Sequence, residues 1–237
     1  MRVNKNRVKT SFSKSIHSYE KEILVQKKAA LKLCEFSRDF EGFGLDLGCG
    51  TGILSSLLNK NIVGLDISFN MAKIYKTKNE KVVVGDIENI PFKSKTFDFA
   101  VSNFALHWVD VEKGFKEISR VLKEEGKFAF SMPVEGSFKI VQDILGEKNF
   151  DFLDKDYVLD ILSKNFTIKK HETVSYNLEF QNGLELLKHL HSTGSSVGKT
   201  GSTIGEKIKI FQKFKNYNKP AVLNFEVMFV YAINHRF

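Results

Sequence analysis

Hydrophobic residues follow two different periods along the first 133 residues of the chain. Short apolar runs at 44–47, 61–66, 81–86, 97–102 and 127–132 have the length and composition of buried strands. Between these runs, apolar positions recur at helical spacing over 18–38, 52–59, 71–75 and 112–123, and Gly126 is expected to end the last of these helices. Strands that alternate with helices predict βαβ units and a parallel sheet.

After Pro133 this regular alternation stops. The pattern predicts one long helix over 138–164, a sixth strand over 166–176, and helices over 183–192 and 205–216. A polar Gly/Ser/Thr loop at 192–202 separates the last two helices, and a β-rich stretch at 224–233 ends the pattern. We therefore expect an α/β fold in a single domain that spans 1–237.

The composition excludes several classes of protein. With 237 residues, 42% hydrophobic and 27% charged, the chain is globular rather than disordered or fibrous. No apolar run approaches the roughly 18–20 residues of a membrane span, and no apolar segment follows the basic N-terminus to form a secretory signal. Two cysteines, Cys34 and Cys49, are too few for a disulfide framework. We expect a cytoplasmic monomer that has no contact with a membrane.

Basic residues are concentrated in two segments. The net charge is +8, yet 1–33 holds nine Lys or Arg against two Glu, and 186–220 holds seven Lys against one Glu. The remainder of the chain is therefore acidic overall. This segregation indicates a face that meets an anionic partner, although a genome rich in A and T would also produce many lysines.

A glycine-rich loop lies between the first predicted strand and the next helix. It reads Leu45-Asp46-Leu47-Gly48-Cys49-Gly50-Thr51-Gly52. This G-x-G-x-G spacing differs from the G-x-G-x-x-G fingerprint of dinucleotide sites, and no Lys-Ser/Thr pair follows as in a nucleoside triphosphate loop. Glycines allow the backbone to approach a ligand closely. The adjacent Asp46 favours a ligand that carries a cation rather than a phosphate.

Two further carboxylates end the next two predicted strands. Asp66 follows Gly48 by eighteen residues, where an acid commonly accepts hydrogen bonds from ribose hydroxyls. Asp86 ends the third strand and precedes Ile87, a pair suited to an adenine amino group and ring. The carboxyl ends of strands are where open α/β sheets bind ligands.

This arrangement resembles the class I S-adenosylmethionine (SAM) methyltransferases. The resemblance implies a Rossmann-like, seven-stranded, mostly parallel sheet with an antiparallel last strand and a helical insertion. It implies that Asp46 and the glycines hold the methionine part of SAM, that Asp66 holds the ribose and Asp86 with Ile87 the adenine, and that Asn103 lines the sulfonium pocket. The implied cofactor-binding set is Asp46, Gly48, Cys49, Gly50, Asp66, Ile67, Met71, Asp86, Ile87, Asn103 and Phe104.

The chain is also similar, nearly end to end, to a narrower family, the malonyl-[acyl-carrier protein] O-methyltransferases of biotin synthesis. The similarity lies in Phe12, Ser18-Tyr19, Gln26, the block from Gly85 to Phe92, the block from Ser102 to Trp108, Glu135-Gly136-Ser137, the motif from Leu190 to Ser196, and Leu223 to Ala232. It implies methyl-ester formation on the free carboxylate of a malonyl group, with an acidic acyl-carrier protein as partner. It divides the chain into a helical lid (1–38), a SAM-binding half (39–133), an acceptor-side half (134–222) with a basic insertion at about 183–220, and a final strand (223–237).

Two histidines depart from this family's pattern, which usually has Gln at the position of His107 and Lys at that of His191. The resulting candidates for acceptor or carrier contacts are Tyr19, Gln26, His107, His191, Lys207, Lys209 and Lys213. Tyr19 and His107 are also the catalytic candidates, by positioning rather than by general acid or base chemistry, because a carboxylate is already ionised at pH 7. Trp108 is expected in the core. The histidines lack metal-ligand spacing, so we expect no metal.

Three alternatives remain open from the sequence. Another small molecule, such as a quinone precursor or a free carboxylic acid, could accept the methyl group, and carbon methylation would then need a base such as His107. An RNA methyltransferase would use the basic character, although few aromatic residues are interleaved with the lysines. A non-catalytic module could retain the fold, but the intact acids and glycines argue against it.

Overall fold

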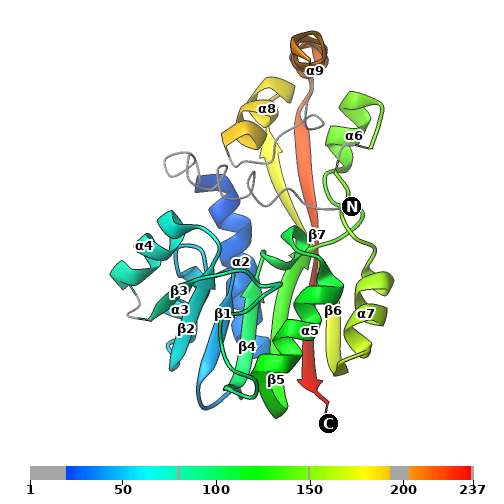
Figure 1. The fold of residues 1–237 in the computed structure, drawn as a ribbon. Coiled ribbons are helices and arrows are strands. Elements are labelled where there is room, and N and C mark those ends of the chain that lie inside the picture. Colours follow the sequence, from blue (N-terminus) through cyan, green and yellow to red (C-terminus); the bar gives the residue numbers. More distant parts are fainter. Residues whose placement is uncertain (1–19, 79–80, 149, 193–202, 236–237) are drawn as a thin grey trace.

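The computed structural model describes residues 20–78, 81–148, 150–192 and 203–235 (Figure 1). Its strands are β1 (Gly44–Leu47), β2 (Ile62–Asp66), β3 (Val82–Val84), β4 (Phe97–Asn103), β5 (Leu122–Pro133), β6 (Phe166–Phe180) and β7 (Ala221–Asn234). Its helices are α2 (Glu20–Phe36), α3 (Ile53–Leu58), α4 (Phe69–Lys78), the short 3₁₀ helix η1 (Leu106–Trp108), α5 (Val111–Val121), α6 (Lys139–Leu145), α7 (Lys155–Ser163), α8 (Gly183–Ser192) and α9 (Ile204–Asn216).

The strands of the described residues form one sheet in the order β3-β2-β1-β4-β5-β7-β6. Strands β1 to β5 pair in parallel, with Gly44 of β1 opposite Ile62 of β2 and Phe99 of β4. The last strand, β7, runs antiparallel to both β5 and β6. This is the predicted Rossmann-like methyltransferase sheet, with the antiparallel last strand in its expected place.

Helices cover both faces of the sheet, as their apolar stripes require (Figure 1). On α5, Phe115 and Ile118 are fully buried against one face, and the Asp110 side chain caps the helix by accepting the Lys113 backbone N–H at 3.2 Å. On the other face, α2 buries Ala29 and Leu33. The core is thus divided by the sheet into two apolar layers.

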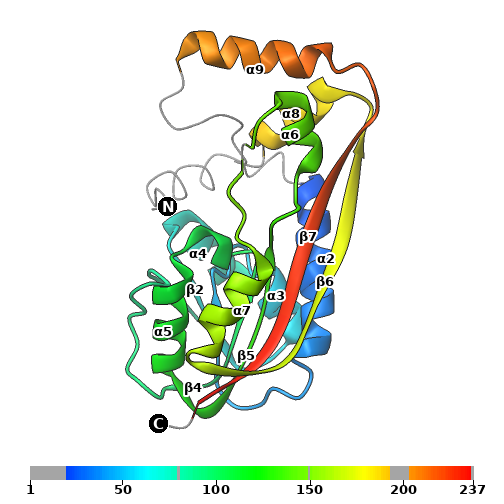
Figure 2. The same cartoon turned by 90° about the vertical axis from the view of Figure 1, so that its right-hand side faces the viewer.

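The last two strands are much longer than the others and extend past the rest of the sheet (Figure 2). They pair from Phe166 opposite Asn234 to Phe180 opposite Ala221. Helices α6, α8 and α9 gather at the far end of this two-stranded arm, with α9 across its tip (Figure 2). Phe214 of α9 is fully buried there. We call α6, α8, α9 and the far ends of β6 and β7 the cap.

Two predicted helices end at other residues than expected. The helix expected over 138–164 is two helices, because α6 ends at Leu145 and α7 begins only after Asp154, whose side chain accepts the backbone N–H groups of Asp156 and Tyr157. The helix expected over 112–123 ends at Val121, and Gly126, which was expected to end it, lies inside β5. Leu122 instead pairs with Phe97 at the start of β5.

Candidate cofactor and acceptor site

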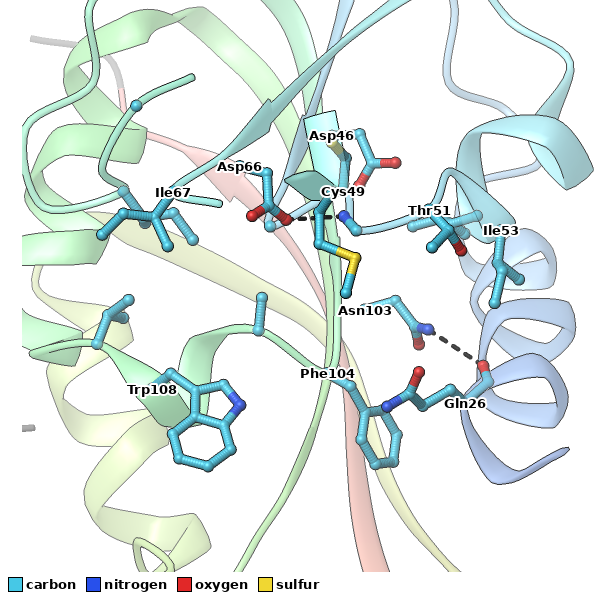
Figure 3. Close-up of a pocket in the computed structure, with 18 of the residues that line it drawn as sticks. Gln26, Asp46, Cys49, Thr51, Ile53, Asp66, Ile67, Asn103, Phe104 and Trp108 are labelled. Atoms are coloured by element: carbon cyan, nitrogen blue, oxygen red, sulfur yellow. Dashed lines mark hydrogen bonds between the residues drawn. The ribbon is translucent and has the colours of Figure 1, made fainter. Parts of the chain in front are cut away.

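A pocket opens where β1, β2, β3 and β4 end, at the carboxyl edge of the parallel strands (Figure 3). It contains every residue of the predicted cofactor set. Its lining consists of Gln26, Asp46, Gly48, Cys49, Gly50, Thr51, Ile53, Leu54, Asp66, Ile67, Met71, Ile74, Gly85, Asp86, Ile87, Asn103, Phe104, Ala105, Trp108 and Val109. The topology therefore brings four separate strand ends to one cavity.

The glycine loop forms the floor of this pocket. Gly48 has φ +67°, and a Cβ there would lie 2.2 Å from the Ala105 Cβ, so the loop can pass the end of β4 only without a side chain. Gly50 also has a positive φ, +51°, but a Cβ there would meet nothing within 4 Å. A side chain at Gly50 would thus occupy free space beside the loop, space that a ligand can use.

Asp66 is the carboxylate at the end of β2, and it is partly buried. Its Oδ2 accepts the backbone N–H of Gly50 at 2.8 Å (Figure 3). Its Oδ1 accepts the backbone N–H of Ser68, also at 2.8 Å. Burial raises the pKa of this carboxyl, against the two backbone hydrogen bonds. Each oxygen retains a lone pair with which to accept a hydroxyl of a ligand.

Asp46 at the end of β1 is only 1% exposed. Its Oδ2 accepts the Ser55 hydroxyl at 2.6 Å, and the Ser55 Oγ in turn accepts the Tyr75 hydroxyl at 2.8 Å. Burial raises the pKa of Asp46 to about 7, with a further contribution from the nearby Asp66. A cationic ligand group would restore the ionised form of this carboxyl.

The third acid, Asp86, follows β3 and lies beside an apolar wall. Its Oδ1 accepts the backbone N–H of Glu88 at 3.0 Å. Met71 and Ile87 are buried, at 5% and 7% exposed, and line the same pocket with Ile67. A carboxylate next to aliphatic side chains can accept from an amino group while the wall packs on a flat ring.

The side of the pocket formed by α2 and the end of β4 carries uncharged groups (Figure 3). The Asn103 amide is fixed there, because its Nδ2 donates to the Gln26 backbone carbonyl at 3.1 Å and its Oδ1 accepts the Ser131 hydroxyl at 2.6 Å. Phe104 and Trp108 face the same space (Figure 3). Gln26 also lines the pocket. The hydrogen bond between the Asn103 side chain and the Gln26 carbonyl attaches α2 to the rim of the pocket.

His107 and Trp108 differ from their expected places. Trp108, expected in the core, lines the pocket, whereas His107 is not among the lining residues. Its ring instead packs against Phe104 at 6.3 Å, Trp108 at 4.8 Å and Phe152 at 6.4 Å, measured between ring centroids. Burial lowers the pKa of His107 to about 3, and its Nδ1 makes no hydrogen bond with the described residues. The imidazole is therefore neutral at pH 7.

The remaining acceptor candidates lie on the cap or outside the described residues. Tyr19 and the motif residues 193–196 fall outside the described part of the chain. His191 on α8 and Lys207, Lys209 and Lys213 on α9 are exposed. The ammonium of Lys213 donates to the Leu145 carbonyl at the end of α6. None of these four residues lines the pocket at the strand ends.

Several lining residues were not predicted from the sequence as site residues: Thr51, Ile53, Leu54, Ile74, Gly85, Ala105, Trp108 and Val109. Most of these residues are direct neighbours in the sequence of predicted site residues. Their position next to the strand ends could therefore have identified them. Ile53 and Leu54 begin α3, and Ile74 lies one turn after Met71 on α4. Helical spacing could have identified Ile74 from Met71.

No group of three or more His, Cys, Asp or Glu side chains is arranged to hold a metal ion within the described ranges. In the same part of the chain, no helix is long and apolar enough to cross a membrane.

The strands that form this pocket match those of known proteins. The profile of a methyltransferase domain matches residues 45–130, from β1 to β5. An uncharacterised protein of Methanocaldococcus jannaschii is 42% identical over 120 residues, which are 45% of this chain and 47% of that protein. The malonyl-[acyl-carrier protein] O-methyltransferase of Hamiltonella defensa is 33% identical over 58% of this chain and 56% of its own length. The chain thus spans about half the length of these two relatives.

A longer match decides the family. The malonyl-[acyl-carrier protein] O-methyltransferase of Haemophilus influenzae is 30% identical over 206 residues, 81% of this chain and 78% of that protein. This chain belongs to the malonyl-[acyl-carrier protein] O-methyltransferase family. The geranyl diphosphate C-methyltransferase of Streptomyces coelicolor has the same fold, with a TM-score of 0.58 and 15% identity over 92% of this chain and 86% of that one.

The methyltransferase-domain match covers the strands that form this pocket, and the relatives in this family are named as methyltransferases. The pocket fits SAM on its own geometry. The cradle beside Gly50 is free of side chains, Asp46 can meet an ammonium group, and Asp66 retains acceptors for hydroxyls. An apolar wall beside Asp86 suits the adenine ring.

Proposed function

We propose that this methyltransferase esterifies the free carboxylate of a malonyl group carried on an acyl-carrier protein, an early step in making the pimeloyl part of biotin. The observation that carries the proposal is similarity to proteins of that name over most of the chain, including 29% identity over 88% of both this chain and the protein of Calditerrivibrio nitroreducens. The similarity includes the acceptor-side half as well as the cofactor half.

The three acids, the glycine loop and the end of β4 each have a proposed role toward SAM. Asp66 accepts from the ribose hydroxyls, Asp86 with Ile87 holds the adenine, and Asp46 with the loop at Gly48 and Gly50 holds the methionine part. When bound, SAM supplies a methyl group on a positively charged sulfur. Asn103 and Phe104, fixed at the end of β4, lie where the acceptor and this group would meet.

The uncharged acceptor side supports a carboxylate as acceptor. A malonyl carboxylate is ionised at pH 7 and needs no general base, so the protein has only to position it and exclude water. An arginine clamp would hold the anion more strongly but would also reduce its reactivity. Asn103, Gln26 and Trp108 line the pocket and can surround a carboxylate without neutralising it.

The low pKa of His107 argues against carbon methylation of a quinone precursor. That chemistry would need a base whose pKa lies near the working pH, and His107 was the sequence candidate. Burial lowers the pKa of His107 to about 3, which makes the imidazole a weak base. We therefore favour an acceptor that arrives already ionised.

The lysines of the cap support an acidic carrier as partner. Helix α9 carries Lys207, Lys209, Lys213 and Lys215 against Glu206. Acyl-carrier proteins are small and acidic, and a cationic surface accelerates their diffusional encounter with an enzyme. The helix lies across the tip of the arm, beyond the carboxyl edge of the sheet (Figure 2).

Methyl transfer from labelled SAM to three acceptors tests the proposal: malonyl-carrier protein, malonyl-CoA and bulk RNA. We expect the highest kcat/KM with the malonyl-carrier protein and a product that mild base hydrolyses, as a methyl ester should be. Labelling of RNA, or transfer to none of the three by protein that binds SAM, would contradict it.

A further inference from the structure

A second pocket lies between the cofactor site and the cap. It shares no residue with the pocket at the strand ends. Its lining consists of Glu135, Gly136, Ser137, Phe138, Lys139, Gln142, Lys148, Phe150 and Phe152. Three aromatic rings form its apolar part, and two lysines bring positive charge to it. Neither the fold nor the binding of SAM requires this combination.

The wall of this second pocket is held in place by β7. The backbone N–H of Phe138 donates to the Asn224 carbonyl at 2.8 Å, and the Asn224 Nδ2 donates to the Gly136 carbonyl at 2.7 Å. The Ser137 hydroxyl accepts the Glu226 backbone N–H at 2.9 Å. Such a network leaves the turn before α6 little freedom, so the pocket is formed before any ligand arrives.

Aromatic rings connect the second pocket to the cofactor pocket. Phe138 and Phe150 lie 5.2 Å and 5.9 Å from Phe152, measured between ring centroids. Phe152 contacts His107 at 6.4 Å, and His107 contacts Phe104 at 6.3 Å. Phe104 itself lines the cofactor pocket. These rings form one continuous aromatic cluster, with the second pocket at one end and the cofactor pocket at the other.

The cations of the second pocket are accessible to a ligand. Lys139 and Lys148 are both exposed. The ammonium of Lys148 lies 2.9 Å from the Glu135 carboxylate, and both side chains are about half exposed. An exposed pair of this kind contributes little to stability and can open to admit an anion. Within the described residues, Lys139 has no ion pair.

We propose that the second pocket binds the phosphopantetheine arm of the acceptor, with its phosphate at Lys139 and Lys148 and its chain along the three phenylalanine rings. This inference rests on the proposed function, because it takes the acceptor to be an acyl thioester on such an arm. Lysine is a common partner for phosphate, and apolar rings suit the methylene and gem-dimethyl groups of the arm. The acyl group then reaches the wall formed by Phe104 and Trp108.

Two synthetic acceptors that differ only in the phosphate test this site. We would measure kcat/KM for malonyl-phosphopantetheine and malonyl-pantetheine with the unaltered enzyme and with Lys139→Ala/Lys148→Ala. The unaltered enzyme should prefer the phosphorylated acceptor by about tenfold, a typical effect of one charge-assisted contact. In the variant the preference should fall to about onefold, while SAM affinity and kcat/KM for malonyl-pantetheine stay unchanged.

The matched control is Lys116→Ala/Lys169→Ala, which removes two exposed lysines of α5 and β6 and should retain the preference. Phe152→Leu should lower kcat/KM for both acceptors by the same factor, because the ring contacts the arm and not its phosphate. If the unaltered enzyme shows no preference, or the lysine variant keeps it, the pocket does not bind the phosphate. Failure to methylate any malonyl acceptor would instead overturn the proposed function.

Discussion

The Asp66 carboxylate accepts the backbone N–H of Gly50 at 2.8 Å, so the acid at the end of β2 is joined directly to the glycine loop after β1. The same carboxylate accepts the N–H of Ser68. One side chain thus orients two segments of the pocket while keeping lone pairs for a ligand. Its replacement should affect ligand binding in two ways, through the lost contact and through the released loop.

We expect Asp66→Ala to abolish measurable binding of SAM. Ribose hydroxyls left unpaired in the pocket should each weaken binding by roughly 1–3 kcal/mol, and the freed Gly50 N–H adds to this loss. Titration calorimetry measures the change. Asp160→Ala, at an exposed site on α7, is the matched control and should bind normally. A change of less than about threefold in the affinity of Asp66→Ala, well under 1 kcal/mol, would contradict the assigned role.

Gly50→Val should also prevent SAM binding, by filling the space that the ligand needs. A Cβ at Gly50 meets nothing within 4 Å, so the substitution adds a side chain to the free pocket and not to a packed core. A positive φ makes valine unfavourable there by roughly 1–2 kcal/mol, so melting temperature should be recorded alongside calorimetry.

Gly146→Val provides the control for backbone strain at Gly50. Gly146 has φ +72° and likewise nothing within 4 Å of a built Cβ, but it follows α6, away from the cofactor pocket. It should lower stability to a similar degree and leave SAM affinity intact. Normal affinity in a folded Gly50→Val protein would mean that the loop does not contact the cofactor.

Asp46→Asn should change stability and affinity in opposite directions. Burial raises the pKa of Asp46 to about 7 in the folded protein, against about 3.9 when unfolded. The folded state therefore holds this proton more tightly, and the unaltered protein loses stability as pH rises from about 4 to about 7. Asp46→Asn has no carboxyl to ionise at this position, so its stability does not fall in this way. The difference in free energy of unfolding between the variant and the unaltered protein should therefore grow with pH, by at most about 4 kcal/mol.

Urea unfolding without ligand between pH 4.5 and pH 8 measures this difference. A gap between the two proteins that stays constant over this range would contradict burial of an ionisable Asp46. The affinity of Asp46→Asn for SAM should fall at pH 8, because an amide cannot pair with the ammonium group. In the unaltered protein the affinity should rise with pH below about 7, as Asp46 ionises.

The sequence was most informative at the strand ends. Asp46, Asp66 and Asp86 were recognisable because each follows a short apolar run, and parallel strands necessarily bring their carboxyl ends to one edge. Local pattern could not decide which of His107 and Trp108 faces the pocket, since both lie in one turn of η1. Their orientation depends on packing against Phe104 and the distant Phe152.

Contacts between residues far apart in the sequence also limited what could be predicted for the acceptor-side half. The break between α6 and α7 follows from Asp154, whose capping role is visible only once the helix start is known. The bond from Lys213 to the Leu145 carbonyl joins residues 68 positions apart, which helical spacing cannot reveal. Lys209 and Lys213 are four residues apart in one helix and therefore share a face, but this spacing does not show that Lys213 is already engaged.

That contact divides the lysines of α9 into two kinds. Lys213 should act on the stability of the cap, because its ammonium is bound to the end of α6. Lys207, Lys209 and Lys215 are exposed and make no ion pair with the described residues, so they are available to an acidic carrier. Lys213→Glu should therefore lower the melting temperature more than any of the other three reversals.

We expect reversing Lys207, Lys209 and Lys215 to Glu to slow transfer to malonyl-carrier protein by about ten- to a hundredfold in kcat/KM at low salt, with a much smaller effect on malonyl-CoA. The loss should shrink as ionic strength rises past about 0.15 M, where the Debye length falls to roughly 8 Å. Steady-state rates across a salt series measure it, and Lys116→Glu/Lys169→Glu controls for charge alone. An equal loss of kcat/KM on both substrates, or a loss that does not depend on salt, would mean that these lysines are only part of a solvent-exposed surface.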